Sequence, residues 1–363
     1  MRNSISMFQA IILCCLVSLS NITIAQAGAP VVVSSLIIGA NEARQRAQNS
    51  LSDDPILSDL AENSGGQTDG GIGYSAPNFV TTNTGLNSVI SSSPPRSLGY
   101  STGFTSDKKI RVWGAGTFSN SKENDQKQKY QAGLVGIGYQ INPSAQVGLL
   151  TQFDSAKETD TALSASVSSK GYYVGPYFVL QLPNEVIVDG RLAFGKSTLK
   201  ISPNGTFTDS ITTSKTLFSS NVSRPYEVGA WTVLPKVGVR HVSEDQPAYV
   251  NGGAITIAAQ TIKLGQATAG ASFSTEFEMD NGFIASPHVG LTGIWTFEDT
   301  GFFNKTTGTA SRNSKGEFSG QLDFGFAISN AENVSLSISG FHEGLGDTDY
   351  TATGGKIKLI AAF

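Results

Sequence analysis

Apolar residues alternate with polar or small residues from residue 109 to the C-terminus. In the first segment, Ile110, Val112 and Phe118 share one phase and the residues between them are polar or small. A period of two places successive side chains on opposite faces of a β-strand. The pattern therefore predicts strands with one apolar and one polar face. We find twelve such segments, starting near Ile110, Val135, Val147, Tyr172, Val186, Thr213, Trp231, Ala269, Phe283, Leu322, Val334 and Ile357.

The connections between these segments are expected to alternate in length. Short turns are predicted at 142–144, 183–184, 227–230, 280–282 and 329–333, and longer polar loops at 119–127, 157–166, 202–212, 243–260, 298–317 and 343–348. An even number of antiparallel strands with short turns on one side and long loops on the other is typical of an outer-membrane β-barrel. We therefore predict an all-β fold, a twelve-stranded antiparallel transmembrane barrel over residues 109–363.

Charged residues occupy the phase opposite to the apolar residues. An Arg or Lys on the lipid-facing side of such a barrel costs ~2–4 kcal/mol near the midplane, whereas a wet inner wall tolerates it. A soluble β-sandwich or barrel would exchange the two faces, and alternation alone does not separate these alternatives. In the membrane reading, the residues predicted to line the lumen are Arg111, Asp189, Arg191, Lys236, Arg240, Glu276, Glu278, Asp323, Lys356 and Lys358.

Residues 28–108 lack strand periodicity. Leu36, Ala40, Ala43, Ala47 and Leu51 fall on one face of a helix, which predicts a short N-terminal helix over about 35–50. Asp53-Asp54-Pro55 ends that pattern. Residues 63–107 are rich in Gly, Ser, Thr, Asn and Pro, a composition typical of a flexible linker. We interpret 28–108 as helix plus linker, a short or vestigial passenger.

The first 27 residues are predicted to be a secretory signal peptide. Arg2 precedes an apolar run, and Ala25-Gln26-Ala27 offers the small-residue pattern of a cleavage site. Both cysteines, Cys14 and Cys15, lie in this segment. Removal of the segment would therefore leave a chain without disulfides.

Composition narrows the function classes. The chain has 363 residues, a net charge of −4 and 15% charged residues, against ~25% in an average soluble domain. This balance excludes a polybasic nucleic-acid binder. The three histidines fall on different predicted strands, so no metal site is expected. No nucleophile elbow, P-loop or dinucleotide motif is present, and we predict no cofactor and no enzymatic activity.

Several segments resemble a known family. The last residues place Ile357, Leu359, Ala361 and Phe363 at every second position. This pattern looks like the terminal signal that the barrel-assembly machinery reads in Gram-negative outer-membrane barrels. Four further segments resemble strands of the autotransporter translocator domain, a twelve-stranded barrel: 112–116, 133–139, 188–195 and 231–239.

The resemblance implies a type V secretion function at the bacterial outer membrane, with lipid and the assembly machinery as partners. In that family a helix lies in the pore and an N-terminal passenger passes to the surface. Arg44 and Arg46 would then pair with lumen carboxylates such as Asp189, Glu276 or Asp323. The alternative is a passenger-less barrel, either an adhesin or interaction protein whose long loops contact surface partners, or a porin-like channel.

Overall fold

The computed structural model describes residues 29–52 and 109–362, apart from 143, 162–163, 204, 280–282, 301–302, 305–308, 311–313 and 330–333. The expected signal peptide, the linker expected at 63–107 and Phe363 lie outside the described residues. One long helix, α2 (Ala29–Ser52), precedes the sheet. No helix in the described part of the chain is long and apolar enough to cross a membrane.

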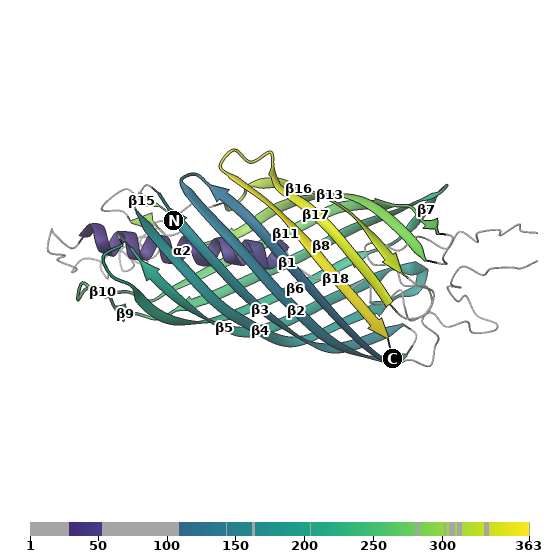
Figure 1. Cartoon of the computed structure of the whole chain (residues 1–363), viewed down its shortest axis with the longest axis horizontal. Coiled ribbons are helices and arrows are strands. Elements are labelled where there is room, and N and C mark those ends of the chain that lie inside the picture. The colour runs from purple at the N-terminus through teal and green to yellow at the C-terminus, as the bar shows by residue number, and fades with distance from the viewer. Residues whose placement is uncertain are drawn as a thin grey trace, which may run out of the picture.

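Twelve long antiparallel strands form one closed wall (Figure 1). The last of them, β18, pairs with β1 from Arg111↔Ala362 to Glu123↔Tyr350, and this pairing closes the barrel. The expected twelve-stranded antiparallel barrel with an N-terminal helix is confirmed. The wall strands are β1 (Ile110–Glu123), β2 (Gln126–Asn142), β3 (Ala145–Asp160), β4 (Ala165–Gln181), β5 (Ile187–Ser202), β6 (Asp209–Ser223), β8 (Trp231–Gln246), β11 (Gln260–Ser274), β13 (Ile284–Asp299), β16 (Phe318–Ser329), β17 (Val334–Leu345) and β18 (Tyr350–Ala362).

Shorter elements lie at the two ends of the wall. They are β7 (Tyr226–Val228), β9 (Tyr249–Val250), β10 (Thr256–Ile257), β12 (Phe277–Glu278), β14 (Phe303–Asn304), β15 (Thr309–Ala310) and the 3-10 turn η2 (Pro183–Glu185). We call the end that carries the β5–β6, β8–β11 and β13–β16 connections the long-loop mouth. The opposite end, where β1 begins and β18 ends, is the terminal mouth.

The outer face of the wall is apolar. Phe153 is 61% exposed, Leu149 59% and Ile137 52%, although each is a large hydrophobic side chain. Their neighbours in the opposite phase, such as Gln152 and Leu150, are buried inside the barrel. A continuous apolar outer surface would cause the protein to aggregate in water. The soluble alternative, which would put the apolar phase inside, is therefore wrong.

The strands are longer than the apolar pattern predicted. They run for 12 to 17 residues, whereas ~9–11 suffice to cross a bilayer. The loop expected at 119–127 is instead a two-residue turn at 124–125, because the polar sequence on either side continues β1 and β2. The ends of these strands contain few apolar residues, so the apolar alternation does not extend to them and does not predict their full length.

One predicted strand is displaced. The apolar phase Ala269–Met279 suggested a strand that carried Glu276 and Glu278 on its inner face, but β11 ends at Ser274. Glu278 lies in the short strand β12 and is exposed, and Glu276 lies between the two strands. The placement of these two glutamates on the lumen wall is therefore wrong.

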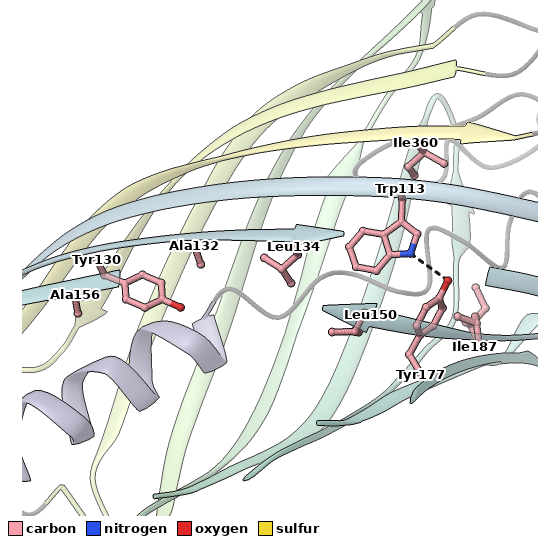
Figure 2. Close-up of a cluster of buried hydrophobic side chains, with 10 residues drawn as sticks. Trp113, Tyr130, Ala132, Leu134, Leu150, Ala156, Tyr177, Ile187 and Ile360 are labelled. Atoms are coloured by element: carbon pink, nitrogen blue, oxygen red, sulfur yellow. Dashed lines mark hydrogen bonds between the residues drawn. The ribbon is translucent and has the colours of Figure 1, made fainter. Parts of the chain in front are cut away.

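Inside the wall near β1–β5, an apolar cluster fills part of the lumen (Figure 2). The Trp113 indole N–H donates to the Tyr177 hydroxyl at 3.1 Å, and the two rings meet edge to face with centroids 5.9 Å apart. The indole lies over Gly136, where a Cβ would stand only 2.3 Å from it. Glycine in these strands therefore makes room for lumen aromatics.

Candidate functional site: the helix within the barrel

Helix α2 lies inside the barrel, in the half next to the long-loop mouth (Figure 1). Its Gly39 carbonyl accepts a 3.0 Å bond from Gln246, the last residue of β8 before the long β8–β11 connection. Leu51, near the other end of the helix, lies deeper and contacts the middle of the wall. The N-terminus of α2 therefore faces the long-loop mouth, and its C-terminus faces into the lumen.

The side chains described on α2 from Ile38 to Leu51 are all buried. A polar helix that is buried on every face needs hydrogen-bonding partners in its surroundings, because a buried polar group without such a partner lowers the stability of the fold. The inner wall supplies that partner. Among the described side chains of α2, small apolar clusters with aliphatic or aromatic wall residues include Ile38, Ala40, Ala43, Ala47 and Leu51.

Arg46 connects the helix to several strands of the wall. Its Nη2 lies 2.6 Å from both carboxylate oxygens of Glu244 on β8. Its Nε lies 3.2 Å from Glu42 one turn earlier, and its Nη1 lies 3.9 Å from Asp154 on β3 and also donates to Ser197 on β5. Three wall strands are therefore tied to one guanidinium.

Arg44 points to a different part of the wall. It donates to Glu123 at the end of β1, and its Nη1 lies 3.7 Å from Asp299 at the end of β13. Both carboxylates are buried. Because the two arginines reach opposite sides of the barrel, the helix is held from several directions.

Amide and hydroxyl side chains complete the contact. Gln48 donates to Glu343 at 2.9 Å. Asn49 donates to Gln128 at 2.7 Å and accepts from Ser119 at the same distance. Ser50 lies 3.1 Å from the Tyr130 hydroxyl. Each of these polar groups has a matched partner on the wall, so the register of the helix along the lumen is specified.

Two wall arginines meet the C-terminal end of the helix. Arg240 donates to the Leu51 carbonyl at 2.7 Å, and Arg191 reaches the Ser50 carbonyl at 3.5 Å. The last carbonyls of a helix have no partner within it and carry the negative end of its dipole. Arg191 and Arg240, both predicted to line the lumen, thus lie where a cation stabilises α2.

The predicted partners of Arg44 and Arg46 are wrong. Asp189 lies near the start of β5, at the terminal-mouth end, where it accepts from Asn221 at 3.0 Å. Asp323 lines a cavity beyond the helix, and Glu276 lies outside β11. The helix occupies the other half of the lumen, so none of these three carboxylates reaches it.

The carboxylates that do bind the helix were missed. They are Glu123, Asp154, Glu244 and Asp299, with Glu343 as an acceptor for Gln48. Most of them lie in segments where the sequence predicts loops, and a predicted loop assigns no inner or outer face to its residues. Glu244 shares the phase of Arg240 and Glu123 that of Arg111, which is the signal that could have placed both on the inner face.

The remaining predicted lumen residues lie on the inner phase of their strands. Arg111 donates to Gln146 at 3.1 Å near the terminal mouth. Lys358 faces the lumen between Ala115 and Ser337 in the register. Lys236, Asp323 and Lys356 line a cavity of about 120 Å³ that starts at Leu51, and the Lys356 ammonium lies over the Phe341 ring at 5.2 Å.

The predicted assembly signal lies partly within the described chain. Ile357 and Leu359 are half exposed on the outer face of β18, and Ala361 continues the same phase. Phe363 is outside the described residues.

Three titratable side chains away from the helix lie on or near the wall. His241 lies 3.1 Å from Glu298, and His288 is buried on the lumen side. On the β9 hairpin, burial and the nearby Asp209 charge raise the pKa of Tyr249 to about 12. Within the described ranges, no group of three or more His, Cys, Asp or Glu side chains is arranged to hold a metal ion.

Comparison with known proteins agrees with this architecture. A family model described as "Autotransporter beta-domain" matches residues 110–340. Among solved structures, the chain is similar to the β domain of the Bordetella autotransporter BrkA, with TM-score 0.59, 14% identity and coverage of 70% of this chain and 100% of that one. It is also similar to the translocator domain of NalP from Neisseria meningitidis, with TM-score 0.55, 11% identity and coverage of 70% and 89%.

The transport unit of AIDA-I from Escherichia coli is similar as well. Its TM-score is 0.54 and its identity 13%, with coverage of 70% of this chain and 90% of that one. At these identities the likeness to solved structures concerns the fold. No curated protein sequence matches the chain.

Proposed function

Because this chain belongs to the autotransporter β-domain family, we propose that it is an outer-membrane translocator whose own N-terminal segment enters the lumen, where α2 closes the pore. The family's barrel is a transport domain found in the outer membrane of Gram-negative bacteria. The proposal therefore includes neither an enzymatic activity nor a resident cofactor.

One observation carries this proposal: the paired polar contact between α2 and the inner wall. Arg44 and Arg46 alone engage four wall carboxylates on β1, β3, β8 and β13. A segment with no role in the lumen would need no such matched set. Exposed ion pairs contribute little to stability, whereas separating the partners of a buried ion pair is costly.

The membrane setting is supported by the outer face. Large apolar side chains such as Phe153 and Leu149 are exposed there, and lipid would cover them. We propose that the long-loop mouth faces the cell exterior, since long loops of such barrels lie outside. The N-terminus of α2 then points to the surface. Recognition of the terminal β18 residues and Phe363 by the barrel-assembly machinery is part of the same proposal.

A cysteine pair tests the position of the helix. Asn49 and Ser119 are hydrogen-bonded across the lumen, so N49C/S119C should form a disulfide in isolated outer membranes. The matched control is N49C/F118C, because Phe118 points outward and is 57% exposed. Disulfide formation in the first pair alone is expected. Failure of both pairs would overturn the placement of α2 in the pore.

The closure itself is tested by conductance. An α-helix with its side chains is ~10–12 Å wide, so its removal should open a path through the barrel. Deletion of residues 29–52 should raise single-channel conductance in a planar bilayer several-fold. Heat-modifiable gel migration of the deletion protein would show that the barrel has folded. Equal conductance of the two folded proteins would instead favour the channel alternative.

Accessibility tests the direction of the helix. A29C, at the start of α2, should react with a membrane-impermeant maleimide on intact cells. K109C, beside β1 at the terminal mouth, should be protected until the outer membrane is opened. The reverse pattern would contradict the proposed orientation.

A further inference from the structure

Lysines gather on the outer face of the wall, at the end of the strands near the long-loop mouth. This group, which we call the lysine patch, consists of seven exposed side chains on the neighbouring strands β1 to β5 (Figure 1): Lys122, Lys127, Lys129, Lys157, Lys170, Lys196 and Lys200. The other outward-facing positions at this end of the five strands, all of them described, hold no Asp or Glu. Asp125 is exposed in the turn between β1 and β2. The outer face is therefore strongly positive here.

Within the patch, lysines face one another across neighbouring strands. Lys122 of β1 is paired in the register with Lys127 of β2, and Lys129 of β2 is paired with Lys157 of β3. Side chains directly opposite each other on one face of a sheet have Cβ atoms ~4.5–5.5 Å apart, and like charges there are destabilising. In the described ranges, no ion pair joins these four lysines to a carboxylate. An anion from outside the chain would remove the repulsion.

The rest of this end of the wall is not basic. On β11, Lys263 has the Glu298 carboxylate of β13 at 4.0 Å. On β8, Asp245 is exposed on the outer face and accepts a hydrogen bond from Thr261. The positive charge is therefore confined to one side of the barrel, which indicates a local binding surface and not a general excess of lysine.

An aromatic row lies on the same outer face, next to the lysine patch on the side of the apolar surface. Its exposed members are Phe118, Phe153, Tyr172 and Phe194. Aromatic girdles of membrane barrels lie at the membrane–water interface. Lys157 is four residues beyond Phe153, and Lys170 is two residues before Tyr172. At ~3.4 Å per residue on a strand tilted by ~40°, these lysines stand about 10 Å and about 5 Å above the row.

That height is the height of lipid headgroups. Each headgroup layer of a bilayer is ~5–8 Å thick, and a lysine side chain can extend toward it while its stem lies on apolar surface. The ammonium groups therefore lie where the charged part of a lipid would be.

We propose that the lysine patch binds a lipid whose sugar headgroup carries more than one phosphate, in the leaflet on the long-loop side. Neighbouring strands are ~4.8 Å apart, so five strands span about 19 Å, which exceeds what one phosphate covers. Lysine is a common phosphate ligand and brings three donors. Ser168 lies between Lys157 and Lys200 in the register, and Thr198 lies opposite Lys170. Their hydroxyls would bond sugar hydroxyls or phosphate oxygens between the lysines.

This inference rests on the proposed function, because it requires the barrel to lie in the outer membrane with the long-loop mouth toward the exterior. It adds a specific ligand to that setting. A phosphate between Lys129 and Lys157 would turn a repulsive cross-strand pair into an attractive bridge, so the lipid would stabilise the strands that it contacts.

Lipid titration of the full chain in a zwitterionic detergent tests the site. The probe is bis-phosphorylated lipid A, and native mass spectrometry counts the bound molecules. K157Q/K170Q, at the centre of the patch, should lower the affinity by about fivefold for each lysine that contacts a phosphate. K157R/K170R should retain binding. K109Q/K263Q removes two charges outside the patch and should bind as the parent does.

Three results would overturn the proposal. They are unchanged affinity in K157Q/K170Q, an equal loss in K109Q/K263Q, and equal affinity for lipid A from which the phosphates have been removed. Competition by inorganic phosphate at the concentration of lipid A would overturn the lipid as ligand. Higher salt should weaken binding to the parent, because the lysines are exposed to solvent.

A reversed charge gives a second, opposite signal. In phosphatidylcholine vesicles, K157E should raise the temperature at which the heat-modifiable band shifts, because the new carboxylate faces Lys129. Addition of lipid A to the vesicles should raise this temperature for the parent and not for K157E. The same response to lipid A in both proteins would overturn the proposal.

Failure of the site can be separated from failure of the proposed function. The lysines face away from the lumen, so the N49C/S119C disulfide should form normally in every patch variant. A parent protein that forms this disulfide but binds no lipid A would overturn the lipid site alone. A parent protein that stays soluble without detergent would overturn the membrane function and the lipid site together.

Discussion

Arg46 of α2 and Glu244 of β8 form a buried ion pair in which one guanidinium nitrogen lies 2.6 Å from each carboxylate oxygen. The two residues are 198 positions apart in the chain. The pair thus joins the N-terminal segment to the wall. Glu42 lies 3.2 Å from the same arginine and belongs to the helix itself. Removal of Arg46 would leave the buried carboxylates of Glu244 and Glu42 without this counter-ion.

Arg46→Ala should therefore release the helix from the wall. Truncation of one partner in a buried pair costs ~3–5 kcal/mol, mainly because the other charge stays buried. We expect the N49C/S119C disulfide to form much more slowly in R46A. K129A, an exposed lysine on β2, is the control and should have no effect. The double variant R46A/E244A should lose less than the two single variants added together. Strict additivity would argue against a direct pair.

Arg240→Ala should weaken the C-terminal end of the helix more modestly. A cation at a helix C-terminus contributes about 0.3–1 kcal/mol, and up to ~2 when partly buried. The concentration of urea needed to expose a cysteine at Ala47 should fall in R240A. Arg240→Lys should retain part of the effect, because it keeps the charge. A lysine variant as weak as the alanine variant would show that the dipole is unimportant and that guanidinium geometry decides.

Arginine substitutions at two neighbouring residues of β13 can compare how the outer and inner faces of the wall tolerate a charge. Leu291 is 55% exposed on the outside of β13, and Thr292 lines the cavity that starts at Leu51. L291R should destabilise the folded barrel by ~2–4 kcal/mol if the outer face meets lipid near the midplane. T292R, which faces the lumen opposite Gln321, should fold normally. Equal folding of both variants in lipid vesicles, measured by heat-modifiable migration, would contradict a membrane-facing outer surface.

The glycines of β2 are not equivalent. A Cβ at Gly136 would stand 2.3 Å from the Trp113 ring, whereas a Cβ at Gly133 would meet nothing within 4 Å. G136A should therefore displace the indole from Tyr177 and destabilise the barrel by about 1–3 kcal/mol. G133A should leave stability unchanged. The shift of Trp113 would appear as altered tryptophan fluorescence relative to the parent, and identical spectra and stabilities for the two variants would refute this account.

The sequence predicts the strands of the wall, but it does not predict where α2 binds within the lumen. Alternation of residues such as Ile110, Val112 and Phe118 is a local signal, because it depends only on the two faces of one strand. The choice of Glu123 and Glu244 as partners of Arg44 and Arg46 depends on how far the helix enters the lumen. No local sequence pattern encodes the position of the helix along the lumen. Glu276 was misplaced for a related reason, since the end of β11 is set by its partners and not by its own apolar phase.

The pairing of β1 with β18 also has a kinetic consequence. Arg111 pairs with Ala362 only when the two ends of the barrel sequence meet. Until then β1 and β18 each have an open edge, which is a template for wrong pairing. Contacts so distant in sequence form slowly. The time spent with two open edges, rather than the final stability of the closed wall, should therefore limit the yield of this protein.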